Sequence, residues 1–84
     1  TMDHYLFVVR SATQAQRMAR VLNSGGIHAS VQRVPAEFAR QGCTYAVRVD
    51  AADFDAAQER LQQAQLTPER ILRHDHAGYS EVAL

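Results

Sequence analysis

The chain has 84 residues, a single cysteine and a formal net charge of zero. A chain of this length forms one small domain, and its neutral charge does not provide the basic surface that nucleic acids or anionic membranes require. It has no apolar run of about 18 residues and no leader-like segment, so we expect neither a membrane span nor a signal peptide, and a lone thiol fits the reducing cytoplasm.

The first elements in chain order are a strand and a helix. Residues 5–9 form an apolar run rich in β-forming side chains, which predicts a central strand. Ser11 followed by Gln14 is typical of a capping box at a helix start. The apolar residues after it recur at helical spacing, which predicts a helix packed on a sheet: Ala15, Met18, Ala19 and Leu22.

A second strand follows this helix. Gly25-Gly26 predicts a left-handed helix stop, and residues 27–33 alternate between apolar and polar side chains, as in a half-buried strand. Val31 is expected to face the core in this strand. Pro35 ends the strand because proline cannot donate to a ladder, and residues 36–42 form a loop or one helical turn.

The second half of the chain again predicts a strand, a helix and a strand. Residues 45–50 alternate as a third strand, and Asp50 is expected to cap a second helix whose apolar face contains Phe54, Ala57, Leu61 and Ala64. Residues 70–73 predict a fourth strand at the sheet edge. We therefore expect one domain over residues 4–74 and a flexible C-terminal tail over residues 75–84, either poorly ordered or docking a partner.

This order predicts an α+β, ferredoxin-like βαββαβ fold with a four-stranded antiparallel sheet and two helices on one face. Right-handed crossovers place the third strand between the first two, so the loop before residue 45 should lie at the same end as the Arg10-Ser11 junction. Cys43 should then face the first helix's N-terminus, whose unpaired amides and positive dipole end favour a thiolate.

Cys43 is the main candidate for chemistry. A lone cysteine excludes a disulfide within the chain, a four-cysteine zinc site and a two-thiolate copper site. His74 and His76 could supply two metal ligands, but a solvated role beside a tail is the better interpretation. We therefore expect no metal and no cofactor. An inert, buried small side chain is the alternative for Cys43 itself.

Several local features together resemble a known family. They are Ser at the first helix cap, Gly-Ile after that helix, and, most specifically, Arg33-Val34-Pro35 followed by a loop ending in Cys43-Thr44-Tyr45-Ala46-Val47-Arg48. Over residues 5–73 the chain resembles the small selenium/sulfur carrier-like proteins. Members of that family typically carry small Ser residues before the cysteine and Gly directly after it, whereas this chain has Gly42 and Thr44 there.

The resemblance implies a protein that is not an enzyme and that holds a sulfur or selenium atom on Cys43. Such a role needs an accessible, low-pKa thiol without a resolving cysteine. Arg33 and Arg40 could stabilise the thiolate or the terminal anion, and Ser11 and Thr13 could donate hydrogen bonds from the helix cap. Ordinary surface arginines and a purely structural helix cap are the alternatives, and Gly42 is expected to give the loop flexibility.

The sequence therefore predicts a carrier that docks to sulfur or selenium donor and acceptor proteins, with no nucleic acid or membrane partner. The alternative is a regulatory or assembly module in which Cys43 is incidental. In that case the open sheet face would pair with a second copy of the chain or with another protein, because an antiparallel sheet covered on one side leaves the other available.

Overall fold

The computed structural model describes residues 3–39 and 44–82. Within them the chain alternates strands with helices and short 3-10 turns. The elements are β1 (His4–Val9), α1 (Ala12–Ser24), β2 (Ala29–Arg33), η1 (Ala36–Phe38), β3 (Tyr45–Asp50), η2 (Ala51–Asp53), α2 (Phe54–Gln63), β4 (Arg70–Asp75) and β5 (Gly78–Val82).

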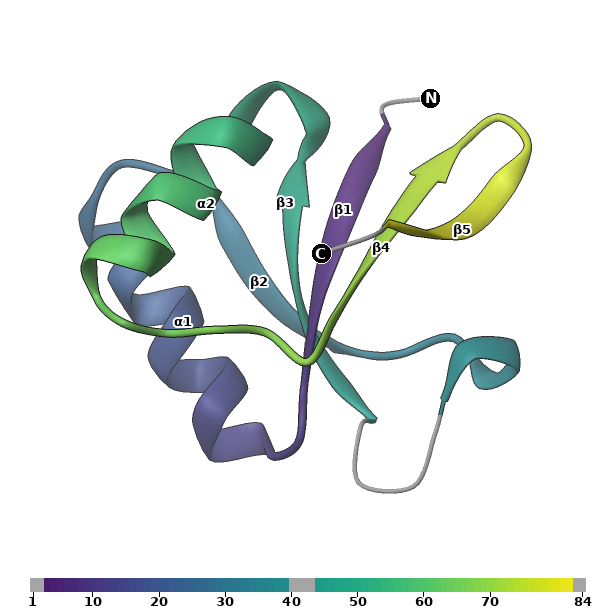
Figure 1. Ribbon diagram of the computed structural model, residues 1–84, viewed down its shortest axis with the longest axis horizontal. Coiled ribbons are helices and arrows are strands. Elements are labelled where there is room, and N and C mark those ends of the chain that lie inside the picture. Colours follow the sequence, from purple (N-terminus) through teal and green to yellow (C-terminus); the bar gives the residue numbers. More distant parts are fainter. Residues whose placement is uncertain (1–2, 40–43, 83–84) are drawn as a thin grey trace.

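The strands form one antiparallel sheet in the order β2-β3-β1-β4-β5. The predicted βαββαβ order is present, with β3 between β1 and β2 as the right-handed crossover rule requires. Both helices lie on one side of the sheet, whereas η1 lies on the other side (Figure 1). Neither helix in the described part of the chain has the length and apolar run needed to cross a membrane.

The prediction of four strands is wrong, because β5 adds a fifth. Residues 78–82, which were expected to belong to a flexible tail, pair with β4 in register from Ile71↔Val82 to Asp75↔Gly78. The turn between the strands suits its residues, since Asp75 Oδ1 accepts a hydrogen bond of 2.9 Å from the Ala77 amide, and Gly78 has φ +106°. β4 is therefore an interior strand and not an edge.

The main core lies between the helices and the sheet. The predicted helix stripes are confirmed at most positions: Ala15, Met18, Leu22, Ala57 and Leu61 are buried in one cluster with Phe7, Val47, Val49 and Ile71. The prediction is wrong for Ala64, which follows the last residue of α2 and is only half-buried. Phe54 is half-buried and stacks on Tyr5, with ring centroids 3.8 Å apart. Val31 is 39% exposed, so its expected place in the core is wrong: it lies on β2, an edge strand.

The ends of the helices follow the sequence in part. Gly26 has φ +84°, which confirms the left-handed stop after α1. The second helix begins later than expected, because the η2 turn follows Asp50 and α2 starts only at Phe54. Asp50 is thus the cap of the 3-10 turn and not of α2.

The face without helices holds a second, smaller core. Leu6, Val8 and Leu72 are fully buried there, beneath Phe38 from η1 and Tyr79 from β5. The Phe38 and Tyr79 rings meet edge to face, with centroids 6.1 Å apart. The centre of this face is therefore covered by the chain's own segments, and the open sheet face expected from the sequence is wrong there.

Candidate functional site

The segments predicted to surround the cysteine loop converge at one end of the sheet. Tyr45, the first residue of β3, is the register partner of Val9 at the end of β1 and of Arg33 at the end of β2. The N-terminus of α1 and the connection from β2 to β3 therefore lie at the same end, as predicted (Figure 1).

Ser11 and Thr13 begin α1 at this end. Ser11 is the N-cap, and its Oγ accepts a hydrogen bond of 3.1 Å from the Gln14 amide, which confirms the predicted cap. Gln14 Oε1 in turn accepts from the Arg10 amide at 3.3 Å. Ser11 and Thr13 are exposed, and the first turn of α1 contains no acidic side chain. The positive end of the helix dipole is therefore not neutralised from within that turn.

Arg33 is the last residue of β2, and β3 lies between it and the end of β1. Its side chain is exposed, and its guanidinium carbon lies 4.8 Å from the centroid of the Tyr45 ring. This cation–π contact holds the positive charge at the base of the connection. The structure thus places Ser11, Thr13 and Arg33 at one end of the sheet, on either side of Tyr45.

Cys43, Gly42 and Arg40 lie outside the described residues, so their predicted roles remain predictions. Residues 34–39 and 44 of the same connection make contacts of their own. The Val34 amide donates a hydrogen bond of 2.9 Å to the Thr44 carbonyl, which joins the two ends of the connection. Between them, η1 packs Phe38 onto the second core.

One residue that the sequence interpretation missed is Arg70. It was assigned only to an exposed edge strand, but it is 7% exposed, and its Nη1 donates a hydrogen bond of 2.6 Å to the Phe38 carbonyl in the connection. Strand alternation was the available signal, because Arg70 faces the same side of β4 as Leu72. Alternation alone does not predict that Arg70 is buried, because η1 and β5, which cover this face, are distant in sequence.

Two histidines cluster near the other end of the same face. His4 and His74 are register partners whose rings stack 4.6 Å apart, and Tyr79 Oη lies 3.0 Å from His4 Nε2. His76 is exposed in the hairpin turn. No group of three or more His, Cys, Asp or Glu side chains suited to a metal occurs among residues 3–39 and 44–82. His74 is therefore part of an aromatic cluster and not a solvated tail residue.

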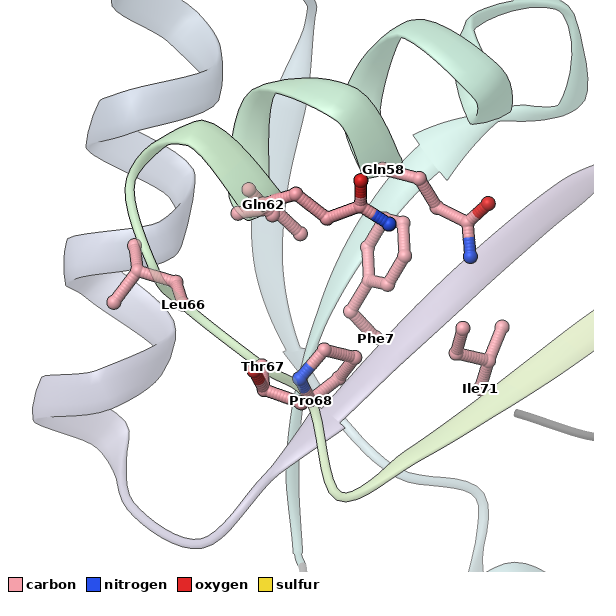
Figure 2. A pocket seen from close by; sticks show the side chains of 8 residues that line it. Phe7, Gln58, Gln62, Leu66, Thr67, Pro68 and Ile71 are labelled. Atoms are coloured by element: carbon pink, nitrogen blue, oxygen red, sulfur yellow. The ribbon is translucent and has the colours of Figure 1, made fainter.

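A pocket of about 280 Å³ opens on the helix side of the sheet. Figure 2 shows its walls: Gln58 and Gln62 from α2, Phe7 and Ile71 from the sheet, and Leu66, Thr67 and Pro68 from the α2–β4 connection. Leu61 completes the lining, which contains amides, a hydroxyl and apolar groups but no ionisable side chain. This pocket therefore offers no cation to an anionic cargo.

Comparison with protein families shows a match over most of the chain. The family described as "Putative Se/S carrier protein-like" matches residues 4–73, which includes every element from β1 to most of β4. No curated protein and no solved structure matches the chain.

Proposed function

We propose, because the chain belongs to the Se/S carrier protein-like family, that it holds one sulfur or selenium atom on Cys43 and passes that atom between partner proteins. The observation that carries this proposal is the family match over residues 4–73, a span that contains the only cysteine of the chain. In this role the protein is a carrier and not an enzyme, and its partners are a donor and an acceptor of the chalcogen.

The transfer requires only one thiolate on this chain. Cys43 as a thiolate attacks the outer sulfur of a donor persulfide, so that a bond forms to Cys43 Sγ while the donor's S–S bond breaks and the donor leaves as a thiolate. An acceptor thiolate then repeats the exchange in the opposite sense, and no external oxidant or reductant is consumed. A second cysteine would discharge the adduct as a disulfide, and this chain has none.

The surroundings of the connection support such a thiolate. The N-terminus of α1 and the Arg33 guanidinium are both at this end of the sheet, and either one favours an anion nearby. Ser11 and Thr13 are exposed at the helix start, where their hydroxyls can donate to an anionic sulfur. A persulfide carrier also fits the reducing cytoplasm, where its free thiol is maintained.

The test is to load the native protein with sulfur and to measure its mass. Incubation with a small-molecule persulfide donor should add one sulfur atom per chain, which a reductant should remove, as read by intact-mass spectrometry. Alkylation of Cys43 in the folded protein should titrate below the free-cysteine pKa of about 8.5. The Cys43→Ser variant, which loses no structural partner thiol, should keep its circular dichroism spectrum and accept no sulfur.

The opposite result is equally clear. A thiol that reacts only after unfolding, or only well above its ordinary pKa, is a buried structural cysteine. That outcome would reject the carrier and favour a module in which Cys43 is incidental.

A further inference from the structure

Arg70 joins three segments of the fold with one buried guanidinium. The side chain projects from β4 onto the face without helices, beside its register partner Val8. Its Nη1 donates to the Phe38 carbonyl of η1 at 2.6 Å, and its Nε lies 3.5 Å from Glu81 Oε1 on β5. With His4, it is one of two buried polar side chains in the part of the chain that the structure describes.

These contacts offset only part of the cost of burying the guanidinium. Arg70 Nη2 is buried without a hydrogen-bond partner, and the ion pair with Glu81 is longer than a hydrogen bond. A buried charge in such an arrangement is often no more stable than an apolar side chain of similar size. Fold stability therefore does not account for an arginine at this position, whereas its bond to the connection gives it a distinct role.

That bond fixes the connection from β2 to β3 at a point between its two ends. The ends are already joined by the hydrogen bond from the Val34 amide to the Thr44 carbonyl. Arg70 adds an anchor at Phe38, whose ring also rests against Tyr79 of β5. The η1 turn of this connection is thus attached to both strands of the β4–β5 hairpin.

We propose that Arg70 is a positioning residue for the connection that contains Cys43, holding it against the β4–β5 hairpin through the Phe38 carbonyl. Its functional meaning rests on the proposed function, because the cysteine of this connection is the proposed attachment point of the cargo. The contacts themselves do not depend on that function. A partner protein that displaced the hairpin would release the same anchor.

Two variants separate this role from ordinary stabilisation. Arg70→Met fills a similar volume without a donor, so the anchor to the Phe38 carbonyl is lost while the apolar packing of this face is largely kept. Arg70→Lys keeps one positive donor and should restore part of the effect. Arg73→Met is the matched control, because Arg73 lies on the same strand but on the opposite face and is 49% exposed.

Two readouts report on the connection itself. The Phe38 and Ala39 amides, which donate to Pro35 and Ala36 carbonyls, should exchange hydrogen at least about fivefold faster in Arg70→Met, while amides of α1 stay unchanged. The pH midpoint of Cys43 alkylation should shift from that of the unmodified chain, because the connection that contains this residue loses its anchor at Phe38. Arg73→Met should match the unmodified chain in both measurements.

Either of two results would overturn the proposal. One is an Arg70→Met variant whose Phe38 and Ala39 exchange and alkylation profile equal those of the unmodified chain. The other is an equal acceleration in α1 and in η1, which indicates general destabilisation. Neither readout needs a chalcogen donor. Failure of the chain to accept sulfur would therefore contradict the carrier role, and the hydrogen-exchange and alkylation results would still test the positioning role.

Discussion

Truncating Leu72 to alanine tests whether the face without helices is a true core. Leu72 is fully buried and lies opposite Leu6, which is also fully buried, beneath Phe38 and Tyr79. The change removes three carbons, worth about 0.8 kcal/mol each in transfer free energy, and the cavity adds to this, so we expect a loss of about 3 kcal/mol. A domain of this size has roughly 4 to 13 kcal/mol of stability, so the variant should remain folded and measurable.

The assay is urea unfolding followed by circular dichroism. The m-value, which is the slope of the free energy of unfolding against urea concentration, should stay unchanged. Leu22→Ala, on the buried stripe of α1, is the helix-side reference and should cost about 2–5 kcal/mol. Val31→Ala is the control, because Val31 is 39% exposed and should cost less than about 1 kcal/mol. If Leu72→Ala loses as little free energy of unfolding as Val31→Ala, and less than Leu22→Ala, then this face is open. That result would favour the assembly-module interpretation.

Two further predictions concern the cap and metal. Ser11→Ala should lower the free energy of unfolding by about 1 kcal/mol, because the Gln14 amide loses its acceptor. If this variant accepts as much sulfur as the unmodified chain, Ser11 is a helix cap and takes no part in holding the cargo. A chelator should leave the melting temperature unchanged, because one thiol and the histidines do not make a closed site; metal that survives gel filtration at one equivalent, with a chelator-induced drop in stability, would contradict this.

The order of the elements could be predicted from the sequence, because periodicity and capping are local properties. The stripe from Ala15 to Leu22 and the Ser11 cap specify α1, and strand alternation specifies β3. The handedness rule then placed β3 between β1 and β2, and so brought Ser11 and Arg33 to one end. The family could be predicted as well, because its resemblance rests on contiguous residues around Arg33 and Cys43.

Only the tertiary structure decided what covers the second face. Residues 78–82 have a weak pattern of their own and become a strand by pairing with β4, whose edge is otherwise free. Arg70 is buried because η1 and β5, far apart in sequence, meet above it through Phe38 and Tyr79. Periodicity shows which side of a strand a residue faces, but the contacts between distant segments determine whether that side is covered or exposed to water.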